Sequence, residues 1–133
     1  MTPPAGLPTV KENDKGVPEI SVKGVAAPKS LISQDLIKGK GQAVKESDTV
    51  TVNYVGVALA SGKVFDSSFT SGKKATFPLN GVIKGWTQGL AGKTVGSRVL
   101  LVIPKDLAYP DATAGSGQPE GDLVFVVDIL GVK

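Results

Sequence analysis

Apolar and polar residues alternate along residues 49–59, and this segment restricts the fold more than any other part of the chain. Val50, Val52 and Tyr54 fall on one side of an extended chain, while the threonines and the asparagine between them fall on the other. A period of two is typical of a β-strand with one face in the core and one face toward water. The segment therefore predicts a half-buried antiparallel strand, and with it a protein built on a β-sheet.

Further strands are predicted on both sides of this segment, and only one helix accompanies them. Residues 98–103 and 123–130 are runs of β-branched residues suited to central strands, and residues 31–38 and 75–79 fit shorter ones. Residues 82–90 instead follow a helical pattern that ends at glycines. We therefore predict an α+β fold in which a twisted antiparallel sheet of five to six strands, a half-barrel, wraps around one short helix.

The predicted helix carries the only tryptophan of the chain. Ile83, Trp86 and Leu90 recur at i, i+3 and i+7, so they share one face of the helix. A single large aromatic residue on a helix usually packs in the core, and it can also form the floor of a binding site. Taken alone, this pattern leaves both interpretations open.

Composition excludes several classes of function. The 133 residues suffice for one domain with a core, and they include no cysteine and no histidine. Disulfides, zinc–thiolate sites and thiol nucleophiles are thereby excluded, and we expect neither a metal ion nor a cofactor. The net charge of +3 is spread over scattered residues, so we expect no nucleic-acid partner. No run approaches the roughly 18 apolar residues that cross a membrane, so no transmembrane segment is expected.

Residues 1–30 differ from the remainder because they contain five of the nine prolines. Such spacing predicts an extended N-terminal arm, with a short strand near residues 19–22 docked on a domain of residues 31–133. Residues 104–122 form a long loop rich in glycine, proline and aspartate. A loop of that length in a small domain is usually functional or mobile.

An ordered set of short motifs runs through the predicted strands, helix and loop. In chain order they are Val52-Asn53-Tyr54-Val55-Gly56, Phe65-Asp66-Ser67-Ser68, Phe77-Pro78-Leu79, Val82-Ile83-Lys84-Gly85-Trp86, Gly89-Leu90, Val95-Gly96-Ser97, Ile103-Pro104, Asp106-Leu107-Ala108-Tyr109 and Leu123-Val124-Phe125. Over roughly residues 31–132 the set resembles the FK506-binding-protein (FKBP) family of peptidyl-prolyl cis-trans isomerases. The Asn80-Gly81 pair directly before Val82 looks like the actinobacterial branch of that family.

The resemblance implies an aromatic pocket between sheet and helix, with Trp86 as its floor. The residues implied to act in catalysis are Tyr54, Phe65, Asp66, Trp86, Tyr109 and Phe125, and those implied to bind substrate are Phe77, Val82 and Ile83. The Ile83 backbone N–H and the Tyr109 hydroxyl are implied to hold carbonyl groups. These carbonyls would belong to a proline-containing polypeptide or to FK506- and rapamycin-type macrolides.

The resemblance also bears on location and assembly. Residues 1–30 resemble the linker that precedes this domain in exported and lipid-anchored actinobacterial relatives. We therefore expect an extracytoplasmic location, with a cytoplasmic location as the alternative, and Met1 would then be an expression start. We expect a monomer.

Prolyl isomerisation suits a chain without histidine or cysteine. Rotation about a peptide bond faces a barrier of about 18–20 kcal/mol because resonance gives the C–N bond double-bond character. The twisted transition state has lost that resonance and is less polar than the planar amide. An apolar pocket therefore favours it without acid, base or nucleophile, and each preference of about 1.4 kcal/mol gives a tenfold gain in rate.

Plainer interpretations exist for the same residues. Tyr54 and Phe125 suit the core of a sheet, and Asp66 suits a turn in which its carboxylate accepts backbone N–H groups. Tyr109 lies in a loop, where an aromatic residue fits a plain role less well. For the whole protein, an FKBP-fold binding or chaperone module with little catalysis is the alternative to an enzyme.

Three departures from the family pattern predict a more open pocket. Ala75 occupies a rim position where many relatives carry an aromatic residue, and Pro110 stands where glycine is usual. Residues 115–122 lack an isoleucine–proline pair that commonly packs over a bound proline. Each change removes apolar cover, so we expect modest activity and weakened macrolide affinity.

Overall fold

Eight strands and two short α-helices account for most of the residues that the structure describes. This computed structural model describes residues 9–12, 18–22, 30–59, 62–71, 74–109 and 121–132. The strands are β1 (Thr9–Glu12), β2 (Pro18–Ser21), β3 (Ile32–Ile37), β4 (Thr49–Ala58), β5 (Val64–Ser67), β6 (Ala75–Pro78), β7 (Arg98–Ile103) and β8 (Leu123–Val132). The helices are α1 (Ser68–Ser71) and α2 (Lys84–Leu90), and the 3₁₀ turns are η1 (Leu79–Gly81) and η2 (Lys105–Leu107).

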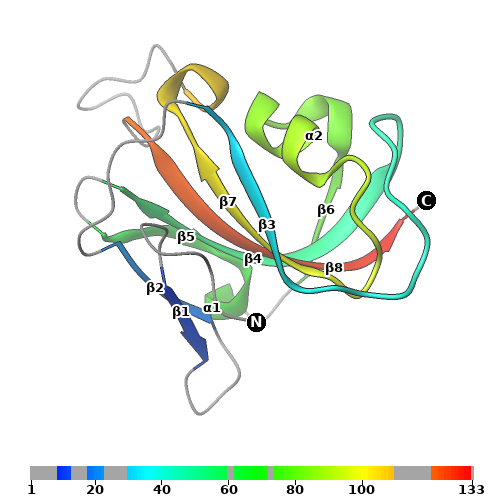
Figure 1. Cartoon of the computed structure of the whole chain (residues 1–133), viewed down its shortest axis with the longest axis horizontal. Coiled ribbons are helices and arrows are strands. Elements are labelled where there is room, and N and C mark those ends of the chain that lie inside the picture. Colours follow the sequence, from blue (N-terminus) through cyan, green and yellow to red (C-terminus); the bar gives the residue numbers. More distant parts are fainter. Residues whose placement is uncertain are drawn as a thin grey trace.

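Six of these strands form one antiparallel sheet, in which β4 holds the central place (Figure 1). The strand order is β3-β7-β8-β4-β5, and β6 shares with β5 the outer edge of β4. On its inner edge β4 pairs along nearly its whole length with β8. On its outer edge it pairs with β6 through residues 49–52 and with β5 through residues 55–57. The predicted α+β fold with an antiparallel sheet of five to six strands is confirmed.

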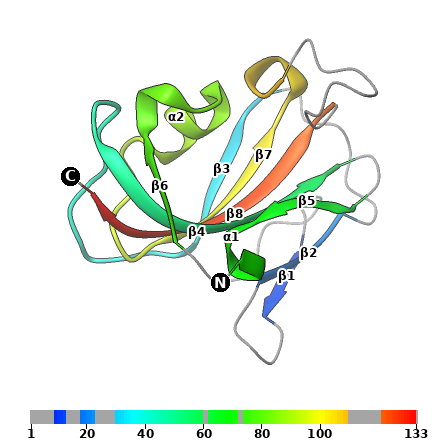
Figure 2. The same ribbon diagram turned by 180° about the vertical axis from the view of Figure 1, so that it is seen from behind.

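Helix α2 lies across the concave face of this sheet (Figures 1 and 2). Gly85 and Gly89 allow the helix to approach β7 closely. A Cβ atom at Gly85 would lie 2.5 Å from a side-chain atom of Ile103, and one at Gly89 would lie 2.5 Å from a side-chain atom of Leu101. Since Trp86 follows Gly85, this close approach sets the depth at which its indole enters the core.

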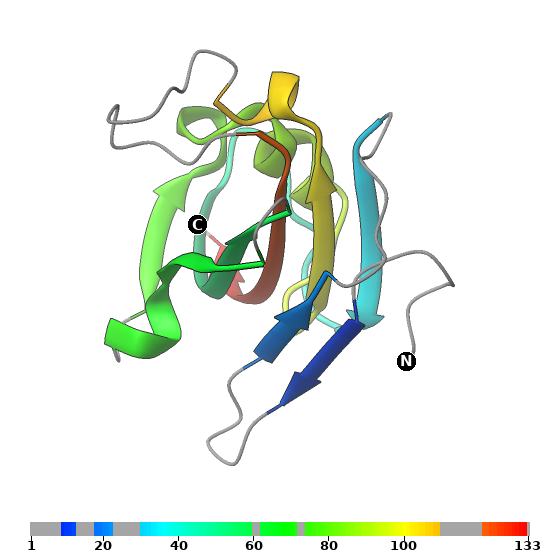
Figure 3. The same cartoon turned by 90° about the vertical axis from the view of Figure 1, so that its left-hand side faces the viewer.

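The opposite face of the sheet is also apolar, and the N-terminal hairpin covers part of it (Figure 3). The buried residues of this face are Leu36, Val55, Val57, Leu100, Val102, Val124 and Val126. Strands β1 and β2 pair with each other, and Val10, Ile20 and Val22 pack against this face. The short strand predicted near residues 19–22 is present as β2, while β1 is an addition to the prediction. The division of the chain at residue 30 stays a prediction.

The second apolar face corrects the prediction that β4 is half-buried. The prediction of one polar, partly exposed face is correct for the first residues of the strand. From Val55 to Val57 both faces are buried, because Val55 and Val57 lie on the hairpin side.

The helical elements also differ from the prediction. Helix α2 begins at Lys84 rather than at Val82, because η1 precedes it, Val82 is extended, and Ile83 is its N-cap residue. Helix α1 adds a single turn directly after β5, so the described part of the chain holds more than one helix. Of the loop predicted at residues 104–122, η2 is helical, and residues 110–120 lie outside the described residues.

Candidate active site

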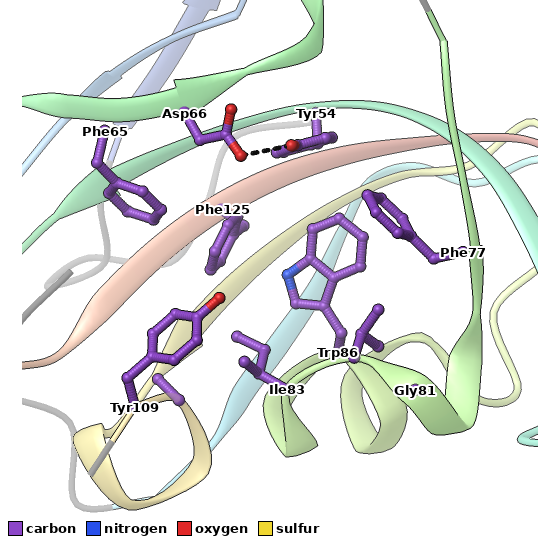
Figure 4. Close-up of a pocket in the computed structure, with 11 residues that line it drawn as sticks. Tyr54, Phe65, Asp66, Phe77, Gly81, Ile83, Trp86, Tyr109 and Phe125 are labelled. Carbon is purple, nitrogen blue, oxygen red and sulfur yellow. Dashed lines mark hydrogen bonds between the residues drawn. The ribbon is translucent and has the colours of Figure 1, made fainter. Parts of the chain in front are cut away.

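A cavity of about 510 Å³ opens between the concave face of the sheet and the N-terminal end of α2. The residues that line it are Tyr54, Phe65, Asp66, Phe77, Gly81, Val82, Ile83, Trp86, Ala108, Tyr109 and Phe125 (Figure 4). The structure thus brings together all nine residues that the resemblance implied, and the role of each stays a prediction. Gly81 and Ala108 are additional lining residues. Both directly neighbour a predicted site residue in the sequence, which is the signal that could have found them.

Trp86 lies at the floor of the cavity and is only 4% exposed. Three aromatic rings meet its indole nearly at right angles. The ring centroid of Tyr54 lies at 5.3 Å and 82°, that of Phe125 at 5.4 Å and 90°, and that of Phe77 at 5.7 Å and 87°. Aromatic rings attract one another in such edge-to-face arrangements, so the floor is fixed by its neighbours.

Phe65 and Phe125 form a wall of the cavity above β4. Their ring centroids are 5.5 Å apart, with the ring planes perpendicular. Both rings lie over Gly56, where a Cβ atom would come within 2.6 Å of Phe125 Cε1 and 2.7 Å of Phe65 Cζ. The absence of a side chain at Gly56 therefore provides the space that the two rings occupy.

Tyr54 and Asp66 make the hydrogen bond drawn in Figure 4. The Tyr54 hydroxyl donates to Asp66 Oδ2 at 2.5 Å. Burial raises the pKa of Tyr54 well above its ordinary value, and the hydrogen bond to the Asp66 carboxylate raises it further. The hydroxyl therefore remains protonated at neutral pH and holds the carboxylate beside the cavity.

Two hydrogen-bond donors of the cavity have no partner among the described residues. The Ile83 carbonyl accepts from the N–H groups of Trp86 and Thr87 at the start of α2, but no described residue accepts from the Ile83 N–H. The Tyr109 hydroxyl points into the cavity in Figure 4 and likewise bonds to none of the described groups. Both groups are available to donate to carbonyl oxygens of a ligand.

The indole N–H of Trp86 is a third donor, and it is buried without a hydrogen-bond partner in the described part of the chain. Figure 4 shows the indole nitrogen on the side that faces Phe125, whose ring is perpendicular to the indole. An N–H group directed at an aromatic ring gains weak stabilisation. The floor therefore presents mainly apolar surface to a ligand.

The fold, the cavity and the sequence together assign the chain to a class of isomerases. The sequence pattern of the family described as FKBP-type peptidyl-prolyl cis-trans isomerase matches residues 40–130 of this chain. The match covers every residue of the cavity. The chain belongs to this family, which confirms the resemblance drawn from its motifs.

Individual relatives come from several bacteria. The FKBP-type peptidyl-prolyl cis-trans isomerase FkpA of Escherichia coli K12 is 48% identical over 103 residues, which are 77% of this chain and 38% of FkpA. The FK506-binding protein of Streptomyces anulatus is 41% identical over 86% of this chain and 96% of that protein. A relative from Corynebacterium glutamicum is 41% identical over 85% of this chain and 96% of its own length. The latter two support the similarity to the actinobacterial branch.

The structural comparison agrees with the sequence comparison. The crystal structure of FkpA from Escherichia coli matches 93% of this chain and 51% of that chain, with a TM-score of 0.69 and 42% identity. This chain thus spans about half of that structure and 38% of the full FkpA sequence. Across the described residues, no helix has both the length and the apolar character needed to span a bilayer.

Proposed function

We propose that the chain accelerates cis–trans rotation of X–Pro peptide bonds in folding or unfolded polypeptides. The observation that carries this proposal is the cavity floor, where one buried tryptophan is held by three perpendicular aromatic rings. A pyrrolidine ring is apolar and can rest on such a floor. The Ile83 N–H and the Tyr109 hydroxyl stand beside it as donors for the carbonyls that flank the prolyl residue.

The cavity would favour the twisted amide because the planar amide is the more polar of the two. Aromatic walls solvate the planar form less well than water does, so transfer into the cavity costs the planar form more than the twisted form. Hydrogen bonds from Ile83 and Tyr109 would hold the ends of the peptide while the bond between them turns. No covalent bond forms or breaks, and no proton is transferred.

Asp66 would add an electrostatic contribution to the same preference. Tyr54 holds its carboxylate beside the cavity through the 2.5 Å hydrogen bond. A negative charge near a substrate carbonyl repels the planar amide, whose oxygen carries more negative charge, more strongly than it repels the twisted one. Phe65, Phe77 and Val82 would add apolar contacts with the proline ring.

We also propose that FK506- and rapamycin-type macrolides occupy this cavity with weakened affinity. Ala75 packs against the core beside β4 and does not line the cavity, so no aromatic side chain extends the rim at this position. The other two departures that suggested an open rim, Pro110 and most of residues 115–122, lie outside the described residues.

A coupled-protease assay on a short X–Pro peptide, with and without FK506, tests these proposals. We expect acceleration that FK506 abolishes. We also expect FK506 to inhibit the Ala75→Phe variant at lower concentration than the wild type. Thr76→Phe is the matched control, because Thr76 lies on the other face of β6 and contacts Thr51. A folded protein without acceleration would contradict the isomerase and favour the binding or chaperone module.

A further inference from the structure

We infer that Ser68 is a positioning residue for this cavity. Its hydroxyl accepts the hydrogen bond of the Tyr54 backbone N–H where β4 has no outer partner strand, and so fixes Tyr54 beside Asp66. The inference rests on the proposed isomerase function. The motif that contains Ser68 points to Phe65 and Asp66 and gives the serine no role of its own.

Strand β4 changes its outer partner at the point where Tyr54 enters the cavity. The ladder with β6 ends at the pair Val52↔Ala75, and the ladder with β5 extends only as far as Val55. Asn53 and Tyr54 lie between these two ladders and pair only with β8, on the inner edge. The Tyr54 backbone N–H points to the outer edge, where neither β5 nor β6 pairs with it. Backbone N–H and C=O groups left unpaired in a partly buried position destabilise a fold.

The Ser68 hydroxyl satisfies the backbone at this gap. Its oxygen accepts a hydrogen bond from the Tyr54 N–H at 2.7 Å. It also lies within donating distance of Asn53 Oδ1, at 3.2 Å, and of the Tyr54 carbonyl oxygen, at 3.4 Å. Ser68 is 5% exposed, and it shares with Ser97 the property of being a buried polar residue in the described part of the chain.

Ser68 also closes a circuit that includes the cavity. It is the first residue of α1 and stands two residues after Asp66. Tyr54 is therefore joined to this segment twice, through its backbone to Ser68 and through its hydroxyl to Asp66. The same tyrosine ring meets the indole of Trp86 at 5.3 Å. If the backbone contact is lost, the ring gains freedom relative to both the carboxylate and the floor.

The test compares Ser68→Ala with Ser97→Ala. Ser97 is a matched control because it is 2% exposed, accepts a hydrogen bond from the Gly39 N–H at 2.9 Å, and does not line the cavity. Each variant removes one buried hydroxyl that serves a backbone N–H, so both should lose stability. We expect kcat/KM to fall by about tenfold in Ser68→Ala and to stay within about twofold of the wild type in Ser97→Ala.

A second readout separates positioning from a general loss of stability. The ¹³Cζ resonance of Tyr54, assigned with Tyr54→Phe, reports ionisation of its hydroxyl in the folded protein. We expect this group to titrate at lower pH in Ser68→Ala than in the wild type and in Ser97→Ala, because its contact with Asp66 is loosened. Ser68→Thr, which keeps the hydroxyl, should restore both the titration and the rate. Equal rates and equal titrations in the two alanine variants would overturn the inference.

A third measurement needs no variant. Hydrogen exchange of the Tyr54 amide in the wild type should be as slow as that of amides within the β4–β8 ladder, although no strand accepts from it. Fast exchange would overturn the inference even if Ser68→Ala does not fold. If the wild type shows no isomerase activity, the proposed function fails, and the titration and the exchange rate still decide the role of Ser68.

Discussion

Gly56 controls the positions of two aromatic rings through the side chain that it lacks. Phe65 and Phe125 pack edge to face over this residue, at distances that leave no room for a Cβ atom. Protein interiors are packed too densely for the rings to retreat into the sheet. Both rings line the cavity, so the volume available to a ligand depends on this glycine.

Gly56→Ala should therefore narrow the cavity. We expect FK506 binding, measured by calorimetry, to weaken by about tenfold, and the free energy of unfolding to fall by about 1–3 kcal/mol because of overpacking. Gly131→Ala in β8 is the control, since a Cβ atom there meets nothing within 4 Å. The control should stay within about 0.5 kcal/mol of the wild type. Wild-type affinity in Gly56→Ala would contradict this account of the cavity wall.

Among the elements, the β1–β2 hairpin and α2 cover opposite faces of the sheet. Helix α2 and the cavity occupy the concave face, and the hairpin occupies part of the other (Figures 1 and 3). Val10, Ile20 and Val22 contribute the apolar contacts of the hairpin with that second face. The hairpin therefore stabilises the sheet, and none of its described residues lines the cavity.

Removal of residues 1–30 should lower stability and leave catalysis unchanged. Loss of three partly buried apolar side chains predicts a decrease of about 2–4 kcal/mol in the free energy of unfolding, measured with urea. The rate of the folded fraction should match that of the full chain. Removal of residues 1–8 alone, which leaves β1 and β2 in place, is the control. A truncated protein as stable as the full chain would show that the hairpin contacts contribute nothing.

For the molecule as a whole, the sheet could be predicted from the sequence better than its coverings. Strands β7 and β8 follow from β-branched runs, because side-chain shape acts locally. The hairpin could not be predicted in the same way, since β1 has only four residues and its stability depends on packing against the second apolar face. Val55 and Val57 did carry a signal for that face, because both break the alternation of β4 on its polar side.

The cavity shows the same division between local and spatial information. Its nine predicted residues followed from the ordered motifs, whereas the helical pattern alone left Trp86 with two interpretations. Gly56 acts at the contact between two aromatic rings, and Ser68 acts at the gap between two strand ends. Both places exist only in the assembled sheet, so no local sequence pattern predicts them.

Tyr54 also couples the stability of the whole molecule to alkaline pH. Its pKa is raised above the ordinary value of 10.0, first by burial and then by the hydrogen bond to Asp66. The folded state therefore holds this proton more tightly than the unfolded state does. The resulting stabilisation is fully present below about pH 10 and is lost as the pH rises toward the folded-state pKa.

Urea unfolding of the wild type and of Tyr54→Phe at about pH 7, 9 and 11 measures this coupling. The difference in the free energy of unfolding between the two proteins should be constant up to about pH 9 and smaller at about pH 11. Ionisation of lysines common to both proteins cancels in the difference. An unchanged difference at the highest pH would contradict the raised pKa.

The single tryptophan at the cavity floor gives this protein a built-in optical reporter. Trp86 is the only indole in the chain, so all of its tryptophan fluorescence originates at the site itself. Its buried, perpendicular ring neighbours make the emission sensitive to any molecule that enters above it. Occupancy of the cavity and integrity of the core can therefore be followed in real time, without a label, in the unmodified protein.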